Sequence, residues 1–258
     1  MRTVWKRSAS DLMVPPTFDA RVVSVRPLSP SVRELVFERT DGAVFDFEPG
    51  QWVSLLLPGE EGELRRAYSI ASPPRRDASF EVAVTRVDAG VGSLRLHALN
   101  PGDVVRAIGP QGFFTRPARG GAPSLFIGTG TGVAPLRSMI QAALAADDAA
   151  PVWLLFGARD EGDLLYREEL AARAARSPQL RVEQTLSRAD AAWTGRRGYV
   201  QVHARALYEE LARASDLAGG PAPHVYACGL ERMVGAVRAL FRKEVGLGRD
   251  LVHTERYD

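Results

Sequence analysis

The pattern of apolar residues changes once along this 258-residue chain, at the short break Arg119–Pro123 (RGGAP). Before the break, short runs with a period of two are separated by Pro, Gly and Asp, which indicates half-buried strands. After it, apolar strands alternate with longer helical stretches, which is typical of a parallel sheet covered on both faces. We therefore expect an antiparallel β-barrel over residues 17–119 and a doubly wound parallel α/β domain over residues 120–258, preceded by an arm of residues 1–16.

The first half is predicted to hold six strands and one helical turn. In the segment Phe80–Thr85, three apolar residues share one face, and Glu81 and Thr85 share the other. So many short strands in so few residues favour a barrel. The predicted strands are Asp19–Arg26, Val32–Glu38, Gln51–Leu57, Leu64–Ala71, Ser79–Val87 and Asp103–Ile108, and the helical turn is Ser93–Ala98.

The second half is predicted to alternate four strands with four helices. The strands are Ser124–Gly128, Val152–Phe156, Leu180–Thr185 and His224–Ala227, and the helices are Ala134–Ala146, Leu164–Arg176, Val202–Ala214 and Glu231–Val245. Ligands of such sheets bind at the carboxyl ends of the strands. Residues that directly follow a predicted strand are therefore candidates for a binding site.

Composition excludes several classes of protein. The 33 basic residues are matched by 31 acidic ones and are spread along the chain, which argues against a nucleic-acid partner. A single cysteine, Cys228, excludes an internal disulfide, a four-thiolate iron–sulfur cluster and a multi-cysteine zinc site, and the four histidines lack metal-ligand spacing. Redox chemistry would therefore need an organic cofactor. The sequence has no apolar run long enough for a transmembrane segment and no targeting sequence. We therefore expect a cytoplasmic protein.

The segment Arg66–Ser72 (RAYSIAS) is the strongest candidate site of the first half. On a strand, Arg66 and Tyr68 would share a face about 7 Å apart, so that a guanidinium could hold a phosphate beside a ring lying on a planar ligand. The Ser69 hydroxyl would lie at the edge of that ligand. An exposed arginine beside a packing tyrosine explains the same residues. Downstream, a short helix is predicted to begin within Gly90–Leu94 (GVGSL). The free N–H groups at its start could bind an anion. Alternatively, Ser93 is only the N-cap of this helix.

A glycine-rich segment, Phe126–Pro135 (FIGTGTGVAP), joins a predicted strand to a helix. Its glycines permit a tight turn and the close approach of a pyrophosphate to the positive end of that helix. The segment departs from the common dinucleotide fingerprint at Val133, and it lacks the Gly-Lys-Ser/Thr of a P-loop. A structural turn without a ligand is the alternative interpretation.

Two further strand ends carry candidate residues. Thr185–Arg188 (TLSR) precedes Arg196–Gln201 (RRGYVQ), and this combination of arginines with a serine hydroxyl suits a ribose 2′-phosphate. It favours NADP, although the nearby Asp190 keeps NAD possible and a solvated basic loop is the alternative. Tyr226–Gly229 places the Cys228 thiol at the ligand-binding edge, where it could also be a small buried apolar residue.

In this order, the motifs resemble those of the ferredoxin–NADP reductase superfamily, from about Asp19 to the C-terminus. The resemblance rests on Arg66–Ser72 for the flavin motif Arg-x-Tyr-Ser, Gly92–Leu94 for the pyrophosphate segment, Gly128–Pro135 for the nicotinamide-nucleotide loop, Ser187-Arg188 for the 2′-phosphate pair and Cys228-Gly229 for the nicotinamide side.

That resemblance implies that Arg66 binds the FAD pyrophosphate, Tyr68 stacks on the isoalloxazine and Ser69 bonds near flavin N5. Because a regular strand would turn Ser69 away from the ligand, we expect the strand to bend there. Together, the motifs and the resemblance give these further cofactor-binding candidates: Ala67, Val84, Thr85, Gly92, Ser93, Leu94, Gly128, Thr129, Gly130, Thr131, Gly132, Ala158, Arg159, Ser187, Arg188, Arg197, Gly229 and Tyr257.

The last six residues, His253–Asp258 (HTERYD), are similar to family C-termini in which a glutamate assists at the nicotinamide and an aromatic ring covers the flavin. Glu255 and Tyr257 occupy those positions, and Asp258 after the aromatic residue departs from the pattern. The candidate catalytic residues are therefore Ser69, Cys228 and Glu255.

The resemblance implies an FAD enzyme of the bacterial stand-alone type, with neither a plant-type targeting segment nor a fused cluster domain. It would transfer hydride from NADPH to flavin and then single electrons to ferredoxin, flavodoxin or an oxygenase component. A reductase of free flavin or quinone, and a flavin-binding relay subunit of a larger complex, are the alternatives. The sequence predicts no oligomeric state.

Overall fold

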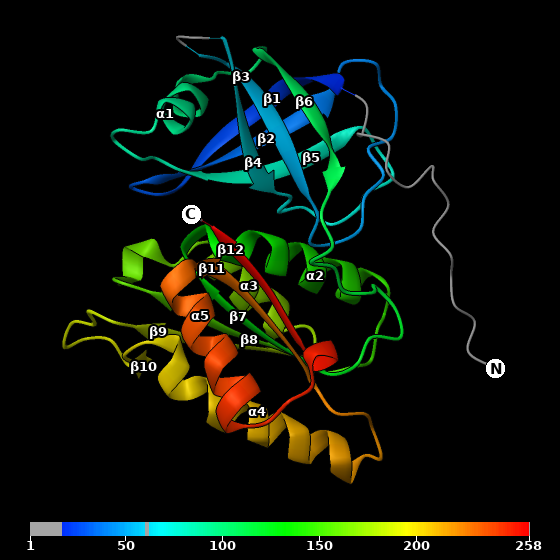
Figure 1. Cartoon of the computed structure of the whole chain (residues 1–258), viewed down its shortest axis with the longest axis vertical. Coiled ribbons are helices and arrows are strands. Elements are labelled where there is room, and N and C mark those ends of the chain that lie inside the picture. The colour runs from blue at the N-terminus through cyan, green and yellow to red at the C-terminus, as the bar shows by residue number, and fades with distance from the viewer. Residues whose placement is uncertain (1–16, 60–61, 258) are drawn as a thin grey trace.

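The computed structural model describes residues 17–59 and 62–257, arranged as two domains stacked along the longest axis of the molecule (Figure 1). The predicted arm of residues 1–16 lies outside the described residues, as does Asp258. No helix of the described segments has the length and apolar character needed to cross a membrane.

The first domain is an antiparallel sheet of six strands, in the order β4-β3-β6-β1-β2-β5. Its elements are β1 (Thr17–Ser29), β2 (Val32–Arg39), β3 (Trp52–Gly59), β4 (Gly62–Ser69), β5 (Ser79–Thr85), α1 (Val91–Ala98) and β6 (Val104–Gln111). An antiparallel bridge between Ile70 and Val82 joins the two edge strands and closes the sheet into a barrel. The six predicted strands and the helical turn are confirmed.

The barrel core follows the predicted alternation along β5. Phe80, Val82 and Val84 are fully buried inside the barrel. The Phe80 ring lies 4.7 Å from that of Phe45, between ring centroids. On the other face, Glu81 is also buried, at 6% exposure, because the second domain packs over it. This buried carboxylate marks where the two domains meet.

The second domain is a parallel sheet of six strands, in the order β10-β9-β8-β7-β11-β12. Its strands are β7 (Ser124–Thr129), β8 (Val152–Ala158), β9 (Leu180–Leu186), β10 (Arg196–Arg197), β11 (His224–Leu230) and β12 (Val252–Tyr257), and its helices are α2 (Val133–Ala145), α3 (Arg167–Ala174), α4 (Val200–Leu217) and α5 (Glu231–Ala239). A π-helical turn, Leu240–Glu244, continues α5, and the 3₁₀ turns are Gly130–Gly132, Glu161–Asp163 and Arg249–Leu251.

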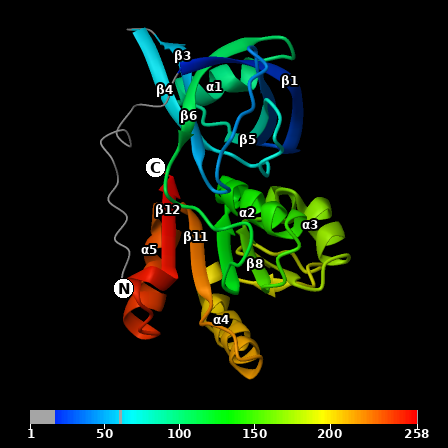
Figure 2. The same cartoon turned by 90° about the vertical axis from the view of Figure 1, so that its right-hand side faces the viewer.

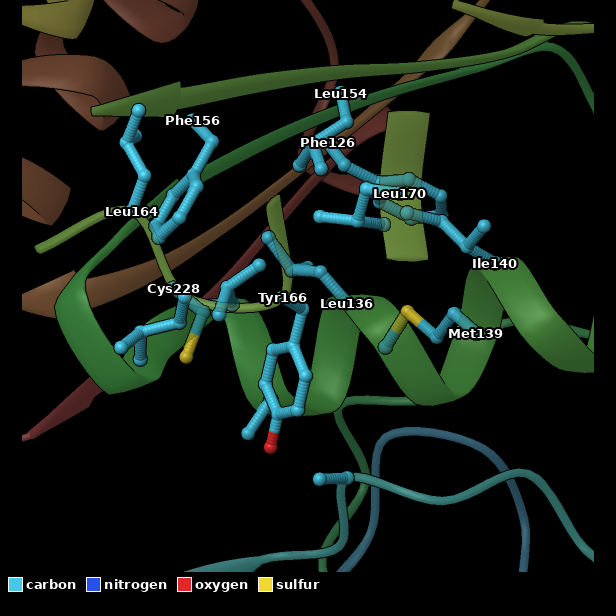
Figure 3. Packing of buried hydrophobic residues seen from close by; sticks show 14 of the residues in the cluster. Phe126, Leu136, Met139, Ile140, Leu154, Phe156, Leu164, Tyr166, Leu170 and Cys228 are labelled. Carbon is cyan, nitrogen blue, oxygen red and sulfur yellow. The ribbon is translucent and has the colours of Figure 1, made fainter. Parts of the chain in front are cut away.

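The helices cover both faces of this sheet, as the doubly wound pattern predicts. Phe126 of β7 packs with α2 and α3 in one apolar cluster, part of which Figure 3 shows, whereas its neighbours Leu125 and Ile127 pack with α4 and α5 in another. Each domain thus has its own apolar core, and α2 lies on the side of the sheet that faces the barrel (Figure 2).

Two strands and one helix start differ from the sequence-based expectation. β10 and β12 were not expected as strands, and β12 pairs in parallel with β11, placing Cys228 opposite Glu255. α3 begins at Arg167 rather than Leu164, because Tyr166 adopts a left-handed conformation with φ 56° and the two preceding leucines enter the core. The end of β12 lies beside the barrel in both views (Figures 1 and 2).

Candidate functional site

A cavity of about 1060 Å³ lies between the two domains and is lined by both. We call it the interdomain cavity. On the barrel side it is lined by the end of β4, part of β5 and the start of α1, and on the other side by the carboxyl ends of parallel strands. The candidate residues that line it are Arg66, Ala67, Tyr68, Ser69, Thr85, Gly92, Ser93, Thr129, Gly130, Thr131, Ala158, Arg159, Ser187, Arg188 and Tyr257. The structure therefore brings most of the predicted motifs to one place.

The remaining candidates do not line the cavity. They are Val84, Leu94, Gly128, Gly132, Arg197, Cys228, Gly229 and Glu255. The Val84 side chain belongs to the barrel core, and its carbonyl oxygen bonds with the His97 ring. The Arg197 guanidinium donates to the carbonyl oxygens of Ala189, Asp190 and Trp193, so it holds its own loop together.

The predicted bend at Ser69 is present. β4 ends at Ser69, opposite Trp52 of β3, and the next residue, Ile70, pairs with β5 instead. Tyr68 and Ser69 are adjacent in the chain, yet both line the interdomain cavity, which a regular strand would not allow. The change of strand partner thus turns the serine hydroxyl towards the second domain.

The Ser69 hydroxyl connects the barrel to the C-terminal strand β12. Ser69 Oγ donates to Glu255 Oε2 at 3.2 Å and accepts from the Tyr257 hydroxyl at 2.7 Å. Burial raises the pKa of Glu255 to about 7, although the hydrogen bond from Ser69 lowers it. Burial also raises the pKa of Tyr257 well above its ordinary value. The three side chains therefore form a hydrogen-bonded group with one carboxyl that titrates near neutral pH.

Cys228 lies under this group, at the end of β11. Its side chain is fully buried, and burial together with the Glu255 carboxylate raises the pKa of its thiol. A thiol in this environment stays protonated and uncharged. The raised pKa of Cys228 therefore favours the neutral thiol over the thiolate.

The raised pKa of Glu255 predicts a pH dependence of stability. In the unfolded chain, a glutamate ionises near pH 4.3. Between that pH and about 7, the native chain keeps a proton that the unfolded chain has released, so rising pH favours unfolding. We expect the free energy of unfolding of the FAD-free chain to fall with pH relative to Glu255→Gln, measured by urea denaturation at each pH. If the unfolding free energies of the wild type and of Glu255→Gln change with pH in the same way, this prediction is wrong. Glu168→Gln, at an exposed glutamate, is the control, and its unfolding free energy should change with pH as that of the wild type does.

Arginines give the interdomain cavity its charge. Arg66, Arg159 and Arg188 were predicted there, and Arg232 and Arg256 line it as well. Within residues 17–59 and 62–257, only Arg256 of these five forms an ion pair, with Glu231. Arg232 is the second residue after β11, at the start of α5, so the strand-end rule used for the other motifs could have found it.

The glycine-rich loop before α2 fits a bound pyrophosphate. Gly130 has φ +54° with open space where a side chain would project, and a Cβ at Gly132 would lie 2.2 Å from the Cys228 carbonyl oxygen. α2 has no acidic residue in its first turn to compete with an anion at its positive end, although the N–H of its first residue, Val133, already bonds to the carbonyl oxygens of Gly130 and Thr131. Thr129 Oγ1 is buried without a hydrogen-bond partner. These observations match a ligand with phosphate and hydroxyl groups.

The fold and this cavity define a two-domain oxidoreductase that binds a flavin nucleotide and a nicotinamide nucleotide. Family models agree: residues 19–115 match the oxidoreductase FAD-binding domain, and residues 126–239 match the oxidoreductase NAD-binding domain. The chain is 59% identical over 241 residues to ferredoxin–NADP reductase B of Sorangium cellulosum (strain So ce56), covering 93% of this chain and 98% of that protein. The chain belongs to the ferredoxin–NADP reductase family.

Reductases of oxygenase systems are also similar to this chain. The reductase component DmpP of phenol 2-monooxygenase from Pseudomonas sp. (strain CF600) is 32% identical over 246 residues, which cover 93% of this chain and 67% of DmpP. The crystal structure of Amycolatopsis cytochrome P450 reductase GcoB superposes with a TM-score of 0.78 at 30% identity, covering 94% of this chain and 70% of GcoB.

Proposed function

We propose that this chain is an NADPH-dependent reductase that holds FAD in the barrel half of the interdomain cavity and passes electrons to a protein acceptor. The observation that carries the proposal is the hydrogen-bonded group Ser69–Glu255–Tyr257, which joins the two nucleotide-binding domains at one wall of the cavity. FAD supplies the ability to take up two electrons together and release them one at a time.

The barrel residues are arranged to hold the flavin nucleotide. Arg66 uses one guanidinium N–H for the carbonyl oxygen of Arg65 and leaves its other donors to the cavity, beside the start of α1. Half-buried Tyr68 presents an aromatic ring to the same space, and burial raises its pKa to about 12, so its hydroxyl stays neutral. Phosphate at the arginine and a planar ring on the tyrosine would therefore bind side by side.

The second domain would hold NADP rather than NAD. Ser187 and Arg188 follow β9, and Arg159 follows β8, so all three lie at the carboxyl edge of the sheet. A forked guanidinium with a hydroxyl suits a 2′-phosphate, whereas NAD sites present an acidic residue to the free ribose hydroxyls. Asp190, the acid nearest to Arg188 in the sequence, uses its carboxylate for the N–H groups of Ala192 and Trp193 and does not line the cavity. Asp163, which precedes α3, is the acid that lines it.

The hydrogen-bonded group Ser69–Glu255–Tyr257 would store and relay the proton that accompanies electron transfer. The Ser69 hydroxyl donates to Glu255 and accepts from Tyr257. It would relay a proton from protonated Glu255 by turning its own O–H to a ligand atom in the cavity and accepting the Glu255 proton in its place. Glu255, with a pKa of about 7, can take up or release that proton at neutral pH. The neutral Cys228 thiol would add no charge beside it.

The acceptor would be a separate ferredoxin, a flavodoxin or an oxygenase component. The printed sequence holds one cysteine and so cannot ligate a four-thiolate cluster. Arg232 and Arg256, the cavity arginines that no cofactor phosphate would use, suit an acidic carrier. We place the reaction in the cytoplasm, because a chain without a disulfide needs no oxidising compartment.

An anaerobic assay of the FAD-loaded chain tests the proposal. NADPH should bleach the flavin absorbance, and the reduced chain should then reduce ferredoxin or flavodoxin much faster than it reduces free flavin or quinone. Preference for free flavin or quinone would make it a small-molecule reductase. No bleaching by either NADPH or NADH would make it an electron relay and contradict the proposal.

A further inference from the structure

An arginine of α2 is buried where this helix packs on the barrel. Arg137 is 4% exposed and contacts carboxylates of both domains. We use the name Arg137 cluster for Arg137 with Glu34 of β2, Glu81 of β5, Glu169 of α3 and the Tyr166 ring. None of these five residues lines the interdomain cavity.

The contacts of Arg137 divide between the two domains. Towards the barrel, its Nη1 donates to Glu81 Oε2 at 2.6 Å and to the Ala71 carbonyl oxygen at 2.9 Å. Towards its own domain, its Nη2 donates to Glu169 Oε2 at 2.8 Å. Its guanidinium carbon lies 4.3 Å from the centre of the Tyr166 ring, the side chain whose hydroxyl points away from the labelled apolar residues in Figure 3.

Each carboxylate of the Arg137 cluster also has an arginine from its own domain. Glu34 pairs with Arg26, and Glu81 pairs with Arg75, within the barrel. Glu169 pairs with Arg173 within the second domain. The barrel carboxylates are therefore paired without Arg137, so their neutralisation does not explain its contacts across the domain boundary. Across the described part of the chain, it alone forms ion pairs from the second domain to strands of the barrel. Among the same residues, the other ion pair across residue 119, Arg116–Asp148, starts from the segment that follows β6.

The two ends of this link lie next to the cofactor motifs. Ala71 follows Ser69 by two residues, and Ser72 accepts a second cross-domain hydrogen bond, from Ser138 Oγ at 2.6 Å. α2 begins at Val133, directly after the glycine-rich loop, and Arg137 is one turn further on. The link therefore joins the segment that follows the flavin strand to the helix that follows the nicotinamide-nucleotide loop.

We infer that Arg137 is a positioning residue, which fixes the orientation of the nicotinamide-binding domain relative to the flavin-binding barrel. The inference rests on the proposed function for its consequence, because transfer between two bound rings requires a fixed separation and angle. Misplacement of reacting groups by about 1 Å can cost roughly 100-fold in rate. The planar fork of arginine can contact Ala71, Glu81 and Glu169 together, which a lysine ammonium cannot do with the same geometry.

Arg137→Lys tests the inference, because it keeps the positive charge and loses the fork. We expect FAD retention and the dissociation constant for NADPH to stay within about twofold of the wild type, because the substituted residue lies outside the cavity. The rate constant of flavin bleaching at saturating NADPH should fall about tenfold. Arg75→Gln is the matched control: it removes the other arginine from Glu81 without crossing between domains, and it should leave this rate unchanged.

Distances between spin labels give a readout that needs no activity. Val23→Cys on β1 and Val202→Cys on α4 place labels at exposed sites of the two domains, and the native cysteine is fully buried. Arg137→Lys should broaden the distribution of label distances, and Arg75→Gln should not. If Arg137→Lys does not fold, Ser138→Ala should give a smaller broadening, because it removes the cross-domain hydrogen bond from α2 to the Ser72 carbonyl oxygen without touching a charge.

A distribution as narrow as that of the wild type would overturn the inference. A loss of FAD or NADPH affinity equal to the loss of rate would also overturn it, since Arg137 would then act through cofactor binding. Failure of the proposed function looks different, because NADPH would then not bleach even the wild-type flavin. In that case the label distances would still decide whether Arg137 sets the domain orientation.

Discussion

Ser69→Ala is expected to slow the NADPH-driven bleaching of bound flavin by about 100-fold, and FAD should stay bound. The substitution removes the hydroxyl that bonds both Glu255 and Tyr257, so the carboxyl that titrates near neutral pH loses its connection to the cavity. FAD should remain because Arg66, Tyr68 and the start of α1, which we propose hold it, are unchanged. Stopped-flow absorbance under anaerobic conditions measures the rate, and gel filtration followed by an absorbance spectrum measures FAD retention.

Ser72→Ala is the matched control for this variant. Ser72 is also buried and lies three residues further along, but its hydroxyl accepts from the Glu81 N–H and does not reach the cavity. Its bleaching rate should match that of the wild type. An unchanged rate in Ser69→Ala would remove the hydroxyl from the reaction, and a colourless Ser69→Ala protein would assign it to FAD binding instead.

Local patterns were sufficient to predict most elements of the fold. The period of two in Phe80–Thr85 places Phe80 in the barrel core whichever strands are its neighbours, and apolar runs such as Val152–Phe156 are typical of buried parallel strands. β12 was not predicted, because Val252–Tyr257 (VHTERY) has neither a continuous apolar run nor a clear alternation. It is a strand because β11 supplies its hydrogen-bond partners.

The candidate site was predictable where its residues are contiguous in the sequence. Arg66–Ser69 and Thr129–Thr131 each lie in one motif, and the fold needed only to bring these motifs to the same cavity. Contacts between distant residues left no such pattern. Arg137 bonds Glu81, which lies 56 positions away, and Glu169, which lies 32 positions away, so nothing in its local sequence distinguishes it from a surface arginine of a helix.

Arg188→Glu is expected to raise the KM for NADPH about 100-fold and to change the KM for NADH less than about threefold. Arg188 is exposed, lines the cavity at the end of β9 and has its guanidinium free of ion pairs within the described residues. A charge-assisted hydrogen bond contributes about 1.5–3 kcal/mol, and the substituted carboxylate adds repulsion of a 2′-phosphate. Each 1.4 kcal/mol corresponds to about tenfold in affinity, which gives the expected loss for NADPH, and NADH lacks the group that Arg188 would contact.

Steady-state kinetics with both nucleotides, at fixed ionic strength, measure this discrimination. Arg176→Glu is the matched charge reversal, at an exposed arginine of the same domain outside the cavity, and it should affect the two nucleotides equally and weakly. It accounts for any general effect of lowering the net charge on an anionic ligand, since long-range attraction is screened within about 8–10 Å at ordinary salt. An equal rise in the KM for NADPH and for NADH in Arg188→Glu would mean that Arg188 binds a group common to both nucleotides, such as the pyrophosphate. Selectivity for NADP would then depend on other residues of the cavity.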